Sequence, residues 1–134
     1  MLRELLGRLC KELSIPPSQM NEHKEFRFRV TKDLEIHLRD LEPGVAIKGQ
    51  IIPCPAGKRE DLFAYLMRAN LLGQGTGGSR IGMDAEEKFL TLSLGLPYEM
   101  DYQLFKDSVE DFVNYLVYWR DNLANFDSET TILS

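Results

Sequence analysis

The stretch of this sequence that comes nearest to a known chemical site is a run of glycines in the middle of the chain. Gly73-x-Gly75-x-x-Gly78 matches the dinucleotide-binding fingerprint, and its first and last glycines also have the Walker A separation. Both signatures bind phosphate when a strand enters the loop and a helix leaves it, because the helix N-terminus then faces the phosphate. Here a predicted helix enters and a predicted strand leaves, and Ser79-Arg80 stands where Walker A requires lysine followed by serine or threonine. We therefore predict a flexible connection and no cofactor.

Two cysteines and two histidines are the remaining candidates for catalysis or metal binding. Cys10 and Cys54 lie far apart without metal-ligand spacing, and two free thiols are favoured over a disulfide. His23 and His37 have no acidic or cysteine companion at ligand spacing, and His37 alternates with apolar neighbours on the polar face of a predicted strand. Nothing marks Cys54 as an activated nucleophile. The sequence thus predicts no catalytic residue, no metal site and no enzymatic activity.

Charge is distributed unevenly along the 134 residues, whose net charge is −5. Residues 1–83 hold 13 basic and 10 acidic side chains, whereas residues 84–134 hold 3 basic and 11 acidic ones. An acidic second half repels phosphates, so we expect no nucleic-acid partner. The first residues contain an early acid and no continuous apolar core, and no apolar run approaches the ~20 residues of a membrane span. These features predict a cytoplasmic protein that does not bind membranes.

Apolar residues at helical spacing predict three helices. The first covers residues 1–13 and ends before Pro16-Pro17, and the second covers residues 59–72. The third follows Asp101, a good N-cap, and has apolar residues in a 4-3-4-3-4 pattern that must pack along its whole length. The stripe of the first helix consists of Leu2, Leu5, Leu6, Leu9 and Leu13. The seam of the third helix consists of Phe105, Val109, Phe112, Leu116, Trp119 and Leu123.

Alternating apolar and polar residues predict the strands. Three strands at 26–30, 34–39 and 45–52 are joined by short links, and a hairpin of 81–84 with 89–96 follows the glycines. In the last strand we expect the leucines on one face and Thr91 and Ser93 on the other. The predicted fold is α+β in the order α-β-β-β-α-β-β-α, with helices packed on a mostly antiparallel twisted sheet. We expect one domain over residues 1–126 and a flexible C-terminal tail over 127–134.

Several of these features together resemble a known family. The most specific is Ala69-Asn70 followed by the glycine loop and then by Ile81-Gly82-x-Asp84. Element order, size and acidity, the leucine-rich strand at 89–96 and the final helix with Phe112, Trp119 and Leu123 agree with it. In these respects the chain is similar to the class I type III secretion chaperones, the Tir chaperone (CesT-like) family.

The resemblance implies a homodimer in the bacterial cytoplasm, although a heterodimer with a related chaperone is also compatible with it. Its partner is the N-terminal segment of a secreted effector, which it holds extended and delivers to the secretion apparatus without ATP hydrolysis. Family members dimerise through the central helix and the strands beside it, which here implies Leu62, Leu66, Ala69, Ile81 and Met83. Cargo lies on the first helix and the sheet and can add a strand to a sheet edge, which implies Leu5, Leu9, Phe26, Phe28, Ile36 and Leu38.

Three alternatives stay open at this point. The six cargo residues can instead form the core of the protomer. A dimer of the same fold can serve as a regulatory or scaffold protein for another cytoplasmic partner. A small hydrolase or transferase whose site carries no visible motif is the third.

Overall fold

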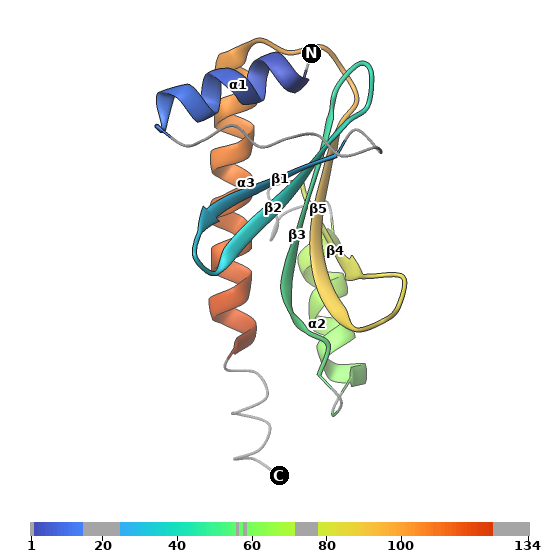
Figure 1. Ribbon diagram of the computed structural model, residues 1–134. Coiled ribbons are helices and arrows are strands. Elements are labelled where there is room, and N and C mark those ends of the chain that lie inside the picture. The colour runs from blue at the N-terminus through green and yellow to red at the C-terminus, as the bar shows by residue number, and fades with distance from the viewer. Residues whose placement is uncertain (1, 15–24, 56, 58, 72–77, 125–134) are drawn as a thin grey trace.

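The structure is a computed structural model, and it describes residues 2–14, 25–55, 57, 59–71 and 78–124. Three helices and five strands follow one another in the predicted order (Figure 1). They are α1 (Leu2–Glu12), β1 (Glu25–Thr31), β2 (Leu34–Asp40), β3 (Val45–Pro53), α2 (Arg59–Asn70), β4 (Arg80–Met83), β5 (Phe89–Leu96) and α3 (Tyr102–Ala124). The α+β prediction is therefore confirmed. The predicted glycine connection at 73–77 and the predicted tail at 127–134 lie outside the described residues.

The five strands form one antiparallel sheet in the order β1-β2-β3-β5-β4. The long helix α3 packs on the central strand β3, α1 crosses α3, and α2 lies beside β4 (Figure 1). Because all three helices contribute to one hydrophobic core, one side of the sheet is covered while the other remains polar. β1 and β4 are the outer strands.

The sequence explains why α3 occupies the centre. Asp101 caps it, since the Leu104 amide donates to the Asp101 carboxylate at 2.8 Å. All six residues of the predicted seam are buried. Gly49 of β3 lets the helix approach closely: a Cβ at this position would lie 2.6 Å from Cδ2 of Leu116.

One local expectation was wrong. Leu13 was placed on the buried stripe of the first helix, but α1 ends at Glu12 and the Leu13 side chain is 49% exposed. Thr91 lies on the polar face, as expected, although its side chain is buried at the floor of a hollow there. The periodicities assumed an element that continues unchanged, and at Leu13 the helix had ended.

Candidate functional site

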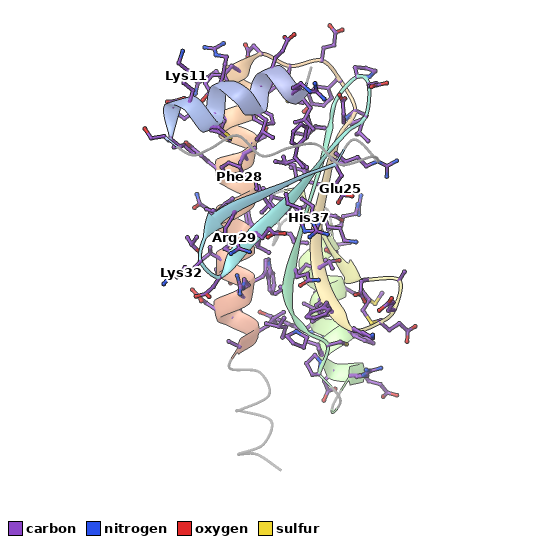
Figure 2. All side chains as sticks on the ribbon, viewed as in Figure 1. Lys11, Glu25, Phe28, Arg29, Lys32 and His37 are labelled. Carbon is purple, nitrogen blue, oxygen red and sulfur yellow. The ribbon has the colours of Figure 1, made fainter. Side chains whose placement is uncertain are left out.

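An apolar groove opens at the outer edge of the sheet, between α1, β1 and α3. Its volume is about 280 Å³. It is lined by Leu9, Leu13, Phe28, Val30, Val109, Glu110, Val113 and Asn114. In Figure 2, Phe28 lies below α1, where β1 passes in front of α3. The groove therefore borders the edge of the sheet's outermost strand.

A polar cluster next to this groove joins the end of α1 to the start of α3. Glu12, at the end of α1, accepts hydrogen bonds from the Tyr102 hydroxyl and from the Lys106 ammonium, the latter at 2.6 Å. The Arg8 guanidinium stacks over the Tyr102 ring at 4.2 Å. The hydrogen bonds from Lys106 and Tyr102 lower the pKa of Glu12, and Glu12 raises the pKa of Lys106 in return. We name Arg8, Glu12, Tyr102 and Lys106 the α1 clamp.

The six residues predicted to face cargo all lie inside the protomer. Leu5, Leu9, Phe26, Phe28, Ile36 and Leu38 are buried members of the core. Only Leu9 and Phe28 also line the groove, from its floor. Sequence reasoning missed Val30, Val109 and Val113 as groove residues, and it counted Leu13 only as helix stripe. Val30 and Val109 belong to the regular strand and helix patterns, and Val113 directly follows the seam residue Phe112, so spacing alone does not mark any of them as groove residues.

The five residues predicted for the dimer interface differ in how exposed they are. Leu62, Leu66 and Ile81 are buried in the protomer, and Ala69 is partly buried. Met83 of β4 is exposed, and so are Met67 and Leu71, which are 72% and 64% accessible. The exposed apolar side chains at α2 and β4 thus include Met67, Leu71 and Met83, whereas Tyr65, also exposed, lies against Trp119 of α3. We call Met67, Leu71 and Met83 the α2–β4 patch.

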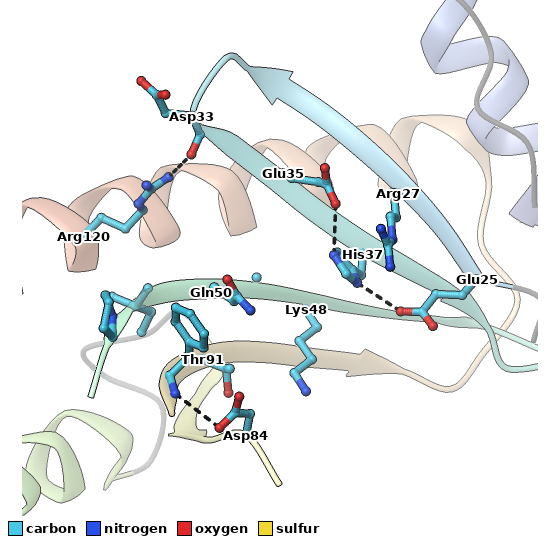
Figure 3. A pocket seen from close by; sticks show the side chains of 14 residues that line it. Glu25, Arg27, Asp33, Glu35, His37, Lys48, Gln50, Asp84, Thr91 and Arg120 are labelled. Atoms are coloured by element: carbon cyan, nitrogen blue, oxygen red, sulfur yellow. Dashed lines mark hydrogen bonds and ion pairs between the residues drawn. The ribbon is translucent and has the colours of Figure 1, made fainter. Parts of the chain in front are cut away.

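The polar side of the sheet has a hollow of about 630 Å³, in which His37 lies between two carboxylates (Figure 3). Its Nδ1 is 3.1 Å from Glu25 and its Nε2 is 3.2 Å from Glu35. The expectation that His37 has no acidic companion was therefore incomplete, because pairing of β1 with β2 brings in Glu25 from twelve residues away. Both ring nitrogens are engaged, and no metal-ligating group of three forms among the described residues. The hollow is a partly exposed polar network in which the His37 ring lies between two carboxylates.

Residues of the predicted family motif have structural roles at β4. The Asp84 carboxylate accepts from the amides of Lys88 and Phe89 at 2.8 and 3.2 Å and so closes the β4–β5 turn. The Asn70 side chain makes two hydrogen bonds to the backbone of Ile81, each 2.8 Å long. Both cysteines are free, as favoured from the sequence; Cys54 lies 3.8 Å from the sulfur of Met83.

Comparison with known proteins decides the family. The sequence profile of the Tir chaperone protein (CesT) family matches residues 4–120. The chain belongs to this family. The resemblance carried by Asn70 and Asp84 is thereby confirmed. No sequence among the curated proteins matches this chain.

Solved structures of low sequence identity share the fold of this CesT-family protein. The chaperone–effector complex of HopA1 and SchA matches with a TM-score of 0.69 and 15% identity, covering 90% of this chain and 93% of the other. The Yersinia pestis type III secretion chaperone SycH, in complex with a fragment of YscM2, matches with a TM-score of 0.64 and 17% identity, covering 89% and 99%. The heterodimeric ExoU–SpcU complex of Pseudomonas aeruginosa matches with a TM-score of 0.66 and 14% identity, covering 92% and 94%. Among the described residues, no helix combines the length and hydrophobicity that crossing a bilayer requires.

Proposed function

We propose that this CesT-family protein is a cytoplasmic type III secretion chaperone of a bacterium. It binds the N-terminal segment of a secreted effector in extended form and delivers it to the secretion apparatus without hydrolysing ATP. Family membership supports the chaperone class. The mode of binding rests on one observation: the apolar groove of Leu13, Val30, Val109 and Val113 runs beside the outer strand β1.

An extended segment can use this edge and the groove together. A strand added to β1 would satisfy its backbone hydrogen bonds on the edge, while every second side chain would point to the covered side and enter the groove. The intervening side chains would lie on the polar side next to Arg27 and Arg29 of β1, where acidic residues are favoured as cross-strand neighbours. The geometry therefore favours a segment in which apolar and acidic or polar residues alternate.

Binding of this kind keeps the effector segment non-globular. A disordered segment loses conformational entropy when it is ordered, so its apolar anchors in the groove must supply the compensating free energy. The groove is present without a bound segment, and the α1 clamp joins two of the elements that line it. No nucleotide is needed to drive such an equilibrium.

The α2–β4 patch supports a homodimer as the working form. Met67, Leu71 and Met83 are large apolar side chains of neighbouring elements that are exposed outside the protomer core. Burying them against a second copy removes them from water without disturbing Leu62 and Leu66, which stabilise α2 within its own protomer. The interface that we propose thus adjoins the residues predicted from the family and shares Met83 with them.

The test first identifies the bound effector and then measures its affinity for variants of the groove. The protein that co-purifies from the native bacterial cytoplasm is identified, and its N-terminal segment is titrated calorimetrically against the wild type, Leu13→Asp and Val117→Asp. Leu13 lines the groove, and Val117 is a similarly exposed apolar residue of α3 that does not. A charge in the groove should weaken binding by about tenfold or more, since truncated anchors commonly cost ~1–3 kcal/mol. Val117→Asp should bind like the wild type.

Leu9→Ala serves as the comparison for a buried anchor. Because Leu9 is in the core, this substitution should lower the free energy of unfolding by about 2–5 kcal/mol in addition to weakening binding. If Leu13→Asp and Val117→Asp bind the segment equally well, the groove is not the cargo site. A partner that is never secreted would instead support a regulatory dimer.

A further inference from the structure

The two outer strands of the sheet differ in whether the backbone groups at their outer edges have hydrogen-bond partners. An edge strand exposes unpaired N–H and C=O groups, and these accept another strand unless something covers them. β1 and β4 are the outer strands. At β4, the side chain of Asn70 lies against the backbone of Ile81: the Asn70 Nδ2 donates to the Ile81 carbonyl at 2.8 Å, and the Ile81 amide donates to the Asn70 Oδ1 at 2.8 Å.

These two hydrogen bonds occupy the outer edge of β4. In an antiparallel ladder, the N–H and C=O of one residue point to the same side of the strand, alternating from residue to residue. Ile81 is opposite Leu92 of β5, yet both of its backbone groups bond to Asn70, so they point away from β5. One edge of a carboxamide presents an N–H donor and a C=O acceptor side by side, as a residue of an antiparallel strand does with its own N–H and C=O. Asn70 therefore takes the place that a neighbouring strand would occupy.

Because β4 is short, a single capped residue interrupts most of its edge. β4 has four residues, and the residue that Asn70 engages is an interior one. β1 has seven residues, and along Phe26–Val30 no described residue outside the sheet hydrogen bonds to its backbone. Among the described residues, an extended partner therefore finds a long edge without other hydrogen-bond partners at β1 and a short, interrupted one at β4.

We propose that Asn70 is a strand-edge cap that closes β4 and so directs extended partners to β1. This rests on the proposed function, because it names the residue that chooses between the two edges for the incoming segment. The cap also keeps the α2–β4 patch a side-chain surface, since two copies cannot join their sheets through Ile81. Asn70 acts by positioning; it need not touch the bound segment.

Three variants distinguish a side chain that blocks strand addition at β4 from one that only attaches β4 to α2. Asn70→Leu keeps the side-chain size and removes both hydrogen bonds, and Asn70→Asp keeps the acceptor for the Ile81 amide but loses the donor. Ser93→Ala is the control, because the Ser93 hydroxyl also bonds to the β4 backbone, at the Arg80 carbonyl, but from the β5 side. Near-ultraviolet circular dichroism shows which variants keep the native packing.

The first measurement is amide hydrogen exchange at Ile81. Exchange should become about tenfold faster or more in Asn70→Leu, the factor that one net hydrogen bond represents, and change less in Asn70→Asp. It should stay at the wild-type rate in Ser93→Ala. Wild-type exchange in folded Asn70→Leu would overturn the proposal.

The second measurement asks whether the freed edge accepts a strand. The probe is a synthetic peptide with the sequence of residues 34–40, the natural antiparallel neighbour of β1. The wild type should bind one peptide per protomer. Folded Asn70→Leu should bind a second peptide, or form assemblies larger than the wild type by sedimentation, with new exchange protection at Arg80–Met83 in either case.

The outcomes judge the two proposals separately. A folded Asn70→Leu protein that has the wild-type mass and binds one peptide per protomer overturns the edge cap. If Asn70→Leu does not keep the native packing, the mass and the peptide stoichiometry of Asn70→Asp decide instead. A wild type that binds no peptide contradicts strand addition at β1, while the mass and the β4 exchange of the variants still decide the role of Asn70.

Discussion

Glu12 shows at the scale of a residue how a surface contact can shape a binding groove. Its carboxylate joins the last turn of α1 to Tyr102 and Lys106 at the start of α3. Leu9 and Leu13, which flank Glu12 in sequence, line the groove on the α1 side. The position of α1, and hence the groove, therefore depends on a charge.

The ionisation of Glu12 makes this dependence measurable. Lys106 and Tyr102 lower the pKa of Glu12 from its ordinary value of 4.5, so the clamp adds stability above that value and loses it as the pH falls through the lowered pKa. We expect Glu12→Gln to unfold more easily than the wild type at pH 7, and the difference to vanish in the acid range below pH 4.5. Urea denaturation at a series of pH values measures it. Glu99→Gln, a matched exposed glutamate, should show no such pH-dependent difference, and a constant gap for Glu12→Gln would contradict the role of its charge.

Asn70 and Asp84 helped to predict the family, but the sequence did not predict what these two side chains bind. The sequence shows an asparagine and an aspartate on either side of a glycine loop, and the structure shows that both bind backbone of the β4–β5 hairpin. Such partners cannot be inferred from spacing, because the hydrogen bonds join Asn70 of α2 to a residue eleven positions later on a strand. Glu25 beside His37 was missed for the same reason, whereas Glu35 lies two residues before His37 on the same strand and was overlooked.

At the scale of elements, periodicity predicted nearly everything that depends on local spacing. All eight elements occur in the predicted order, and the 4-3-4-3-4 seam of α3 is buried throughout. The same reasoning could not separate core from cargo site at Phe28 or Ile36. Alternation in a strand reports that one face is covered, whether by the protein's own α3 or by a partner, and the two coverings leave the same pattern.

Gly49 is a point of close approach between β3 and α3, and it provides a prediction for this packing. An added Cβ would lie 2.6 Å from Leu116, whose side chain is fully buried and has little room to move. We expect Gly49→Ala to lower the free energy of unfolding by about 1–3 kcal/mol, as overpacking does. Urea denaturation is the measurement, and Gly95→Ala on β5, where a Cβ meets nothing within 4 Å, is the control. Adding Leu116→Ala should make the Gly49→Ala cost smaller than it is alone; equal costs in both backgrounds would contradict the contact.

The whole molecule divides its apolar surface between two uses. The groove beside β1 is narrow and lies next to an open edge, which suits an extended segment. The α2–β4 patch projects from a helix and a capped strand, which suits contact between side chains of two folded copies. One protomer can therefore bind a second copy and an effector segment at once, on opposite outer strands of the same sheet.

Dimerisation through the α2–β4 patch can be tested with substitutions that leave the protomer core intact. Leu66 is unsuitable, because it is buried and a charge there would unfold α2. Met67 is 72% exposed, so Met67→Lys should fold normally but convert the dimer to monomer at micromolar concentration, since the lysine charge would lose its hydration in the interface. Sedimentation equilibrium gives the mass, and Leu104→Lys, a charge on an exposed apolar residue in the first turn of α3, should remain dimeric. A monomeric wild type, or a Met67→Lys protein as dimeric as Leu104→Lys, would place the interface elsewhere.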